Sequence, residues 1–491
     1  MALSTNFLED LNPIQQEAAK AIHGPSLIIA GAGSGKTRVL TYRIAYMIQQ
    51  GIDPFNILSL TFTNKAATEM KERIINLIGS HEARNVWMGT FHSIFARILR
   101  SEAERLGYTS NFTIFDTDDA KSVLKGIIKE LDLDSKVYTP GYLLGRISMS
   151  KNNLISDVEY NQNAEIQTTD QATQKPRTGE VFSIYNKRLR KSNAMDFDDL
   201  LFNTNILFRD FPEILYKYQQ KFKYILVDEY QDTNHAQYLI LKKLAASNEN
   251  ICVVGDDAQS IYAFRGANIQ NILNFKKNYP DYKLFKLEQN YRSTQNIVNA
   301  ANSLIKNNQK QIEKKIWTSN DPGEKITIFR SESENSEGLK ISQSIYEHKE
   351  DLQLEYSDFA ILYRTNAQSR AFEESLRKLN IPYRIFGGLS FYKRKEIKDL
   401  IAYFRLSINH NDEEALKRII NYPARGLGQT TLERIISLST EKNVPIWEIV
   451  SNPREHQLQA NAPTLERLID FASKIASFGA QLYTSNAYEL A

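Results

Sequence analysis

Residues 26–37 read SLIIAGAGSGKT, and this stretch decides how the chain folds. The apolar run SLIIA predicts a buried strand, and helical periodicity starts at Lys36, so the glycines lie in a turn between the two. Such a turn aims backbone N–H groups at a phosphate, with Lys36 reaching its oxygens and Thr37 offering a hydroxyl to magnesium. A chance glycine turn is the alternative. The flanking strand and helix favour a nucleotide-binding loop that comprises Ala30, Gly31, Ala32, Gly33, Ser34, Gly35, Lys36 and Thr37.

An acidic pair follows another apolar run, YILVDEYQD at residues 224–232. Asp228 is placed to hold Mg²⁺, and Glu229 to orient and deprotonate an attacking water. Acidic residues also end strands simply because the chain emerges into water, but the glycine loop favours the catalytic interpretation. Lys36 and Asp228 are 228 − 36 = 192 residues apart, which is too long for one crossover and indicates an inserted segment.

Strand-like and helix-like segments alternate over residues 1–92, as in SLIIA, ILSLTF and VWMGTF with NKAATEMKERIINLI between the last two. This alternation predicts an α/β fold with a parallel sheet covered on both faces. Strands return at YILVD and ICVVG, so we expect residues 195–286 to complete that sheet. Residues 93–194 have helical periodicity and predict a helical insertion, with a loosely ordered polar surface over residues 152–179.

A second alternating block covers residues 287–406, with strands expected at ITIFR (326–330) and FAILYR (359–364) and helices at 369–379 and 395–406. The last residues, 407–491, are helical in character. The expected division is therefore 1–92 and 195–286 for a first α/β domain, 93–194 for its insertion, 287–406 for part of a second domain and 407–491 for a partial helical subdomain.

Composition limits the possible classes of protein. Hydrophobic residues make up 42% and charged residues 24% of the chain, which is typical of an ordinary globular protein. The net charge is only +3, so a polyanion would have to be bound by local patterning. Cys252 is the only cysteine and lies in an apolar run, which excludes an internal disulfide framework. Neither an export signal nor a membrane-spanning run is visible, and we expect a cytoplasmic protein.

Residues 253–267, VVGDDAQSIYAFRGA, place an amide, two aromatic rings and a guanidinium just beyond a strand. A polar loop whose Tyr262 and Phe264 cover a domain edge would explain these residues on their own. Flat rings, however, stack on bases without reading their sequence, which suits a single nucleic-acid strand. For this stretch alone, the polar loop is the favoured interpretation, and the neighbouring motifs decide between the two.

Taken together, the motifs resemble those of superfamily 1 DNA helicases of the UvrD/Rep/PcrA kind. The matching segments, in the order typical of that family, are LNPIQQEAA, AGAGSGKTR, TFTNKAATEM, GTFHS, MDFDDLL, VDEYQDTN, VGDDAQSIYAFRGA, LEQNYRS, YRTNAQSR and NYPARGLG. The resemblance implies two RecA-like motor domains, each with a helical insertion, that bind ATP between them and move along single-stranded DNA. Helicase activity in the 3′ to 5′ direction is the function that this family likeness implies.

The resemblance also assigns nucleotide contacts by position. Gln15 would recognise the adenine edge, and Arg38 and Tyr291 would enclose the base. Gln259 would contact the γ-phosphate and the attacking water, and Arg292 would reach the same phosphate from the second motor domain. For Tyr291 and Arg292, an interdomain packing pair is the alternative explanation.

Contacts to single-stranded DNA and to junctions with duplex DNA follow in the same way. The implied residues are Phe62, Thr63, Asn64, Thr90, His92, Phe197, Tyr262, Phe264, Arg265, Arg364, Asn366, Gly426 and Gly428. Phe264 stands where the family usually has tryptophan, so we expect the smaller ring to bind the DNA strand more weakly. The alternatives are a core position for Phe62, a helix N-cap for Asn64 and a plain turn between helices for Gly426 and Gly428. A metal-ligand role for His92 is rejected because no metal-like cluster surrounds it.

Two further motor motifs of the family, including one with an arginine finger, do not occur up to Ala491. We expect the chain to be a shortened form, a fragment or a natural half that needs a partner, with the first favoured, and its ATP turnover to be weak. An ATP- and DNA-binding module without productive turnover is the main alternative. A helicase–nuclease subunit of the RecB or AddA kind would need a carboxylate-rich nuclease domain, which is not visible. Repair or replication partners are expected from the family, whereas the sequence does not define the oligomeric state.

Overall fold

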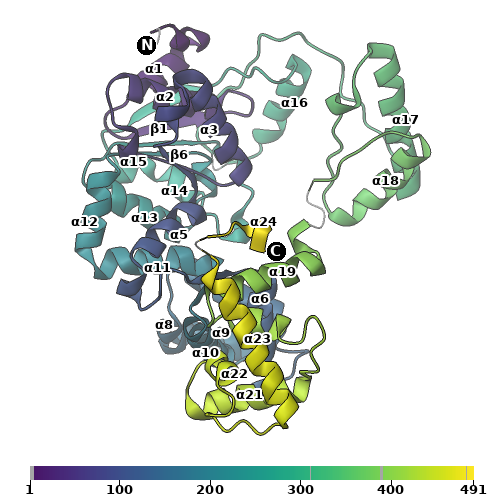
Figure 1. Cartoon of the computed structure of the whole chain (residues 1–491). Coiled ribbons are helices and arrows are strands. Elements are labelled where there is room, and N and C mark those ends of the chain that lie inside the picture. The colour runs from purple at the N-terminus through teal and green to yellow at the C-terminus, as the bar shows by residue number, and fades with distance from the viewer. Residues whose placement is uncertain (1–4, 310, 387–390, 483, 491) are drawn as a thin grey trace. The chain divides into compact units, whose positions relative to one another are not determined.

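The computed structural model describes residues 5–309, 311–386, 391–482 and 484–490. The chain divides into two compact units, one formed by Met1–Gly323 with Arg405–Leu490 and the other by Glu324–Phe404 (Figure 1). Of the described helices, none is both long and apolar enough to cross a membrane.

A six-stranded parallel sheet organises the first unit, with strand order β3-β2-β6-β7-β1-β8. Its members are β1 Ser26–Ala30, β2 Ile57–Thr61, β3 Trp87–Thr90, β6 Tyr224–Val227, β7 Ile251–Gly255 and β8 Lys283–Leu287. The α/β class and the strands predicted from the apolar runs are therefore confirmed. Because parallel strands end at one edge of a sheet, the loops after β1, β6, β7 and β8 converge there.

Both faces of the sheet are buried, and successive side chains of a strand enter different cores. In β1, Leu27 and Ile29 belong to one core, while Ile28 and Ala30 belong to the other. The first core is closed by α5 Phe91–Ser101, α11 Phe197–Asp210, α12 Pro212–Lys221 and α13 His235–Ala245. The second is closed by α1 Pro13–Lys20, α2 Lys36–Gln49 and α3 Asn64–Ile78.

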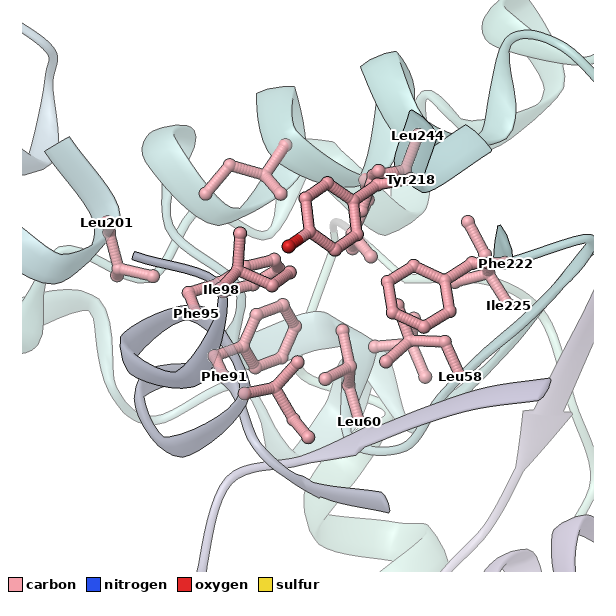
Figure 2. Close-up of a cluster of buried hydrophobic side chains, with 14 of the residues drawn as sticks. Leu58, Leu60, Phe91, Phe95, Ile98, Leu201, Tyr218, Phe222, Ile225 and Leu244 are labelled. Atoms are coloured by element: carbon pink, nitrogen blue, oxygen red, sulfur yellow. The ribbon is translucent and has the colours of Figure 1, made fainter. Parts of the chain in front are cut away.

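Aromatic rings fill much of the first core (Figure 2). Tyr218 and Phe222 stack with ring centroids 5.9 Å apart, and Phe91 lies 6.2 Å from Phe95. Figure 2 shows these rings gathered above Leu58 and Leu60 of β2. This packing anchors the strands whose ends carry the candidate site.

The helices that follow the strands begin where the sequence indicates. Gly35 precedes α2 with φ +84°, a conformation that glycine adopts without steric cost. The segment NKAATEMKERIINLI forms α3 as predicted, but its N-cap is Thr63, whose hydroxyl accepts a hydrogen bond from the Ala66 amide. The alternative that made Asn64 the N-cap is therefore wrong. Thr90 caps α5 in the same way by accepting from Ser93.

The insertion between β3 and β6 is mainly helical and has its own core. It contains α6 Thr117–Glu130, α7 Pro140–Asn152, α8 Asp157–Gln162, α9 Ala164–Ala172 and α10 Thr178–Lys191, with a short parallel pair, β4 Thr113–Phe115 and β5 Ala194–Asp196. The predicted helices are confirmed. The β4–β5 pair was not predicted, since three-residue strands give too little alternation to recognise.

The expectation of a loosely ordered surface over residues 152–179 is wrong. Ser156 begins α8 with a capping box to Glu159, and Tyr160 packs edge-on against Phe182 with centroids 5.8 Å apart. The Tyr160 hydroxyl donates to buried Asp170, which also pairs with Arg146 at 3.0 Å. Polar residues here satisfy one another inside the insertion, so their polarity does not indicate disorder.

A buried ion cluster joins the insertion to α11. Lys151 lies 2.8 Å from Asp196 and 2.7 Å from Asp199, and the Tyr185 hydroxyl donates to Asp196 at 2.9 Å. Burial, with the charge of Asp196, raises the pKa of Asp199 to about 7. The first acidic residue of MDFDD is thus a structural cap and ion-pair partner.

The last block, Arg405–Leu490, is helical as predicted, with α20 Glu413–Ile419, α21 Gln429–Lys442, α22 Ile446–Ser451, α23 Ala462–Ala480 and α24 Ala487–Leu490. It packs on the insertion. Arg405 pairs with Asp119 of α6 at 2.7 Å, and the buried Asn409 amide donates to the Thr113 hydroxyl and to the carbonyl oxygens of Ser192 and Asn193.

The second unit contains α17 Glu334–Leu352 and α18 Ser369–Lys378, which pack together, and most of α19 Lys395–Ile408. The helices predicted at 369–379 and 395–406 are confirmed. The strands predicted at 326–330 and 359–364 are wrong, because neither segment forms a strand in the described residues. A strand needs a hydrogen-bonded neighbour, and with none here Ile328 and Leu362 remain 91% and 90% exposed. Tyr363 and Phe372 line a cavity of about 810 Å³ in this unit.

Candidate nucleotide site and adjoining loop

The glycine loop follows β1 at the carboxyl edge of the sheet, where the sequence placed it. Gly33 and Gly35 have φ values of +69° and +84°, which turn the loop between strand and helix. The Ser34 hydroxyl donates to the Gly31 carbonyl at 2.7 Å, and the Gly31 amide donates to Leu287 of β8. The loop is therefore held by its own side chain and by the neighbouring strand.

The acidic pair after β6 lies directly against this loop. Lys36 Nζ is 3.3 Å from Glu229 Oε2, and Thr37 Oγ1 donates to Asp228 Oδ2 at 3.3 Å. Residues about 190 positions apart in the sequence are thus brought together because β6 and β1 end at the same edge. A hydroxyl and a carboxylate are the oxygen ligands that Mg²⁺ takes beside nucleotide phosphates, so this pair fits the ion.

Burial changes the chemistry of the acidic pair. Burial, with the charge of Glu229, raises the pKa of Asp228 to about 6, and the same two causes raise the pKa of Asp232 to about 6. Glu229 has φ +51°, a left-handed conformation that costs a non-glycine residue free energy. Strained backbone of this kind is concentrated at functional sites, where surrounding contacts hold it.

Gln231 connects the acidic pair to the next loop. Its Nε2 donates to Glu229 Oε2 at 2.9 Å, and its Oε1 accepts from the Asp256 amide at 3.0 Å. Gln259 follows on that loop and donates from Nε2 to Asp256 Oδ2 at 2.7 Å. A continuous chain of contacts therefore runs from Lys36 to Gln259.

The aromatic residues of the same loop face solvent. Phe264 is 78% exposed and Tyr262 39% exposed, with ring centroids 6.0 Å apart. The side chain of Arg265 lies outside the described residues. Because most of the Phe264 side chain is exposed, the alternative in which this ring covers the domain edge does not describe it.

The segment after β8 closes over the glycine loop from another side. The Asn290 amide donates to the Ala32 carbonyl at 2.7 Å, and the Tyr291 backbone N–H donates to Gly33 at 3.0 Å. The Tyr291 hydroxyl accepts from Asn12 at 2.7 Å. Arg292 follows, exposed to solvent beside Gly33. These contacts place Tyr291 and Arg292 at the loop.

Residues expected at the base of the nucleotide also gather here. Buried Gln15 donates to the Ser34 carbonyl at 2.9 Å. The guanidinium of Arg38 lies 5.4 Å from the Tyr42 ring centroid. No hydrogen bond or ring contact joins Arg38 to Tyr291 among the described residues.

Several residues expected to contact DNA line the ends of β2, β3 and β5. His92 and Phe197 meet edge-on with ring centroids 5.5 Å apart, and Phe197 is half exposed. Burial lowers the pKa of His92, which favours the neutral ring. Phe62 is partly buried, 5.6 Å from Phe91, so it is in part a core residue, as the alternative held. Thr63 and Thr90 cap helices.

The remaining expected contacts lie elsewhere in the chain. Arg364 and Asn366 are exposed in the second unit, where the Arg364 amide donates to Gln368. Gly426, with φ +70°, and Gly428 form a turn between α20 and α21 around buried Leu427. The two glycines lie in a turn between helices, and their contact with duplex DNA stays a prediction.

Three residues that contact the glycine loop, the acidic pair or the loop after β7 were not singled out from the sequence. Gln231 and Asn290 lie inside the motifs DEYQD and LEQNYRS, so their neighbours could have indicated them. Lys314, which contacts Asp256 and Asp257, lies in the unremarkable stretch QIEKKIW and carried no signal.

Comparison with known proteins identifies the family to which this sequence is similar. The model of the UvrD/REP helicase N-terminal domain matches residues 11–280, and that of the UvrD-like helicase C-terminal domain matches residues 285–459. The ATP-dependent DNA helicase PcrA of Staphylococcus aureus is 49% identical over 443 residues, which cover 90% of this chain and 60% of the relative. PcrA of Bacillus subtilis is 49% identical over 91% of the chain and 60% of the relative, and PcrA of Leuconostoc citreum is 48% identical over 90% and 58%.

The chain thus spans about 60% of the length of these curated relatives. The two family models together follow nearly the whole sequence, and the first includes both the glycine loop and the acidic pair. The chain belongs to the UvrD/REP helicase family.

Proposed function

We propose that the chain is the ATP-binding motor part of a DNA helicase that moves along single-stranded DNA and separates duplexes. The contact between the glycine loop and the acidic pair, with Lys36 3.3 Å from Glu229 and Thr37 3.3 Å from Asp228, carries this proposal. It is the arrangement that phosphoryl transfer needs, because catalysis there rests on positioning and on neutralising charge.

In ATP hydrolysis, Lys36 would leave Glu229 to bind the β- and γ-phosphates, and Glu229 would then accept a proton from the attacking water. Thr37 and Asp228 would hold Mg²⁺, which neutralises the charge on the phosphates when bound. Gln259 and Arg292 would contact the γ-phosphate, and Gln15, Arg38 and Tyr291 would surround the base. The residues of the glycine loop would contribute backbone amides.

For the DNA strand, exposed Phe264, Tyr262 and Phe197 would stack on bases. Arg265, His92, Phe62, Thr63, Asn64 and Thr90 would line the same path. Arg364 and Asn366 are the DNA contacts that we propose for the second unit. Gly426 and Gly428 would meet the duplex at a junction. In this proposal residues 1–92 and 195–286 form the first motor domain around the insertion at 93–194, while 287–406 and 407–491 belong to the second.

ATP hydrolysis measured with and without a thymidine oligonucleotide tests the proposal. We expect the oligonucleotide to stimulate hydrolysis, and Lys36→Ala to abolish it because the phosphates lose their cation. Lys65→Ala is the matched control, since that lysine is exposed on α3. Binding of nucleotide and oligonucleotide without stimulated hydrolysis would instead identify a binding module, and hydrolysis unaffected by Lys36→Ala would reject the site.

A further inference from the structure

Lys314 is a buried cation between two buried carboxylates. Its side chain is 6% exposed, and its Nζ lies 3.0 Å from Asp256 Oδ1 and 2.5 Å from Asp257 Oδ1. The Ile312 amide donates to the other oxygen of Asp257 at 2.8 Å. Burial alone would lower the pKa of Lys314, but Asp256 and Asp257 outweigh that effect and raise it. The lysine is therefore charged and fixed in place.

The carboxylate that Lys314 touches is the one that holds Gln259. Asp256 accepts from Lys314 through Oδ1 and from Gln259 Nε2 through Oδ2 at 2.7 Å. The Asp256 amide donates to Gln231, which binds Glu229. A rotation of the Asp256 carboxylate would therefore change the position of the Gln259 amide.

Lys314 belongs to a different part of the chain from that loop. Residues 311–317 follow α16 Gln295–Ile305 and return to the end of β8, where the Trp317 amide donates to Glu288 at 2.9 Å. On the way, Ile316 packs over the glycine loop, since a Cβ on Gly31 would clash with its Cδ1. One short segment thus contacts both the glycine loop and the loop that carries Phe264.

We propose that Lys314 is a positioning residue that holds Asp256 so that Gln259 is aligned with the nucleotide while the same loop presents Tyr262 and Phe264 to DNA. The inference rests on the proposed function, since it assigns a residue that links the nucleotide site to the DNA site. Without the cation, Asp256 and Asp257 repel each other in a buried place, and the loop loses its fixed position. Nucleotide and DNA binding would then no longer influence each other.

The test measures the affinity of a fluorescent thymidine oligonucleotide with and without a non-hydrolysable ATP analogue and Mg²⁺. In the unchanged chain we expect the analogue to alter the oligonucleotide Kd by about fivefold or more, a typical coupling between sites. Lys314→Met should reduce this change to less than about twofold, while the chain still binds the analogue on its own. Lys315→Met is the matched control, because Lys315 is the exposed neighbour and should leave the coupling unchanged.

Two more variants distinguish a positioning role of Lys314 from a general role in folding. Lys314→Arg keeps the charge and should retain most of the coupling. Lys314→Met combined with Asp257→Asn removes one charge of each sign. This double variant should restore part of the coupling that Lys314→Met loses. Coupling that persists in a folded Lys314→Met chain, or a folded double variant that restores none, would overturn the inference. Absence of any coupling in the unchanged chain would instead reject the proposed function, and this inference with it.

Discussion

Asp228 shows how burial sets the chemistry of a single carboxyl group at this site. It lies 2% exposed beside Glu229, and its carboxylate has the Thr37 hydroxyl at 3.3 Å as a partner. A buried carboxylate without full compensation holds its proton more tightly than an exposed one. The raised pKa of about 6 therefore describes a group that is ready to bind a cation in place of its proton.

This pKa predicts how stability varies with pH in the absence of Mg²⁺. The folded chain binds the proton on Asp228 up to pH about 6, whereas the unfolded chain releases it near the ordinary value of 3.8. Stability conferred by this proton is present at low pH and is lost as the pH rises from about 4 to about 6. Asp228→Asn should therefore stabilise the fold by about 3 kcal/mol above pH 6 and change little below pH 4.

Denaturant unfolding at pH 4 and pH 8 in the presence of a chelator measures this difference. Asp53→Asn provides a control, since Asp53 caps a short helix before β2 at the opposite edge of the sheet. A stabilisation by Asp228→Asn that is equal at both pH values would contradict the burial argument.

The exposed ring of Phe264 leads to a separate prediction, a loss of DNA affinity in the Phe264→Ala variant. Because the ring is 78% exposed, Phe264→Ala removes little packing, but it deletes a stacking surface. The affinity for a thymidine oligonucleotide should fall by roughly 1–3 kcal/mol, or about 5- to 150-fold. Fluorescence anisotropy gives this value, and nucleotide affinity without DNA should not change. Phe55→Ala, at a half-exposed phenylalanine before β2, serves as the control.

At the scale of elements, β1, β6 and β7 were predictable because each is a continuous apolar run that is buried in the sheet. The strand β8, KLFKL, begins with two exposed residues and was not predicted. The helices α2 and α3 were equally clear from their periodicity. The segments 326–330 and 359–364 have the same local character, yet they form no strand because strand formation depends on a hydrogen-bonded neighbour. The local sequence indicates whether a segment can form a strand, but it does not indicate whether another strand lies beside it.

The residues of the site likewise divide into those that the sequence predicted and those that it did not. The glycine loop and the acidic pair were predictable, because each follows a strand and all parallel strands end at one edge. Gln231 and Asn290 could have been indicated only by the motifs around them, and Lys314 by nothing in its stretch, because their partners lie on other loops and only the folded chain brings them together. Their roles come from contacts, and residue type alone gives no hint of them.

The packing of α5 against the sheet predicts a large loss of stability when a ring is removed. Phe95 is fully buried in the core shown in Figure 2. Phe95→Ala should lower the free energy of unfolding by about 3–5 kcal/mol, because it creates a cavity that the surrounding strands and helices only partly fill. Thermal unfolding followed by circular dichroism measures this loss. The half-exposed Phe55→Ala variant should lie within about 0.5 kcal/mol of the unchanged chain, and equal effects of the two would contradict the described core.

For the molecule as a whole, the two units should unfold in separate steps. The second unit has α17 and α18 but exposes Ile328, Leu362 and Phe386, so it buries little apolar surface. All three tryptophans, Trp87, Trp317 and Trp447, lie in the first unit. Helical circular dichroism should therefore begin to fall at lower urea concentration than tryptophan fluorescence changes. Coincident transitions would show that the chain unfolds as one cooperative unit.

The position of β1 in the sheet has a consequence for how the protein is made. Its two neighbours, β7 and β8, come from residues more than 220 positions further along the chain. A ribosome releases the glycine loop early, but the strands that flank it emerge only after the whole insertion has been synthesised. The nucleotide pocket is therefore assembled late during translation, and the nascent N-terminal third must remain unaggregated until residue 287 has left the exit tunnel.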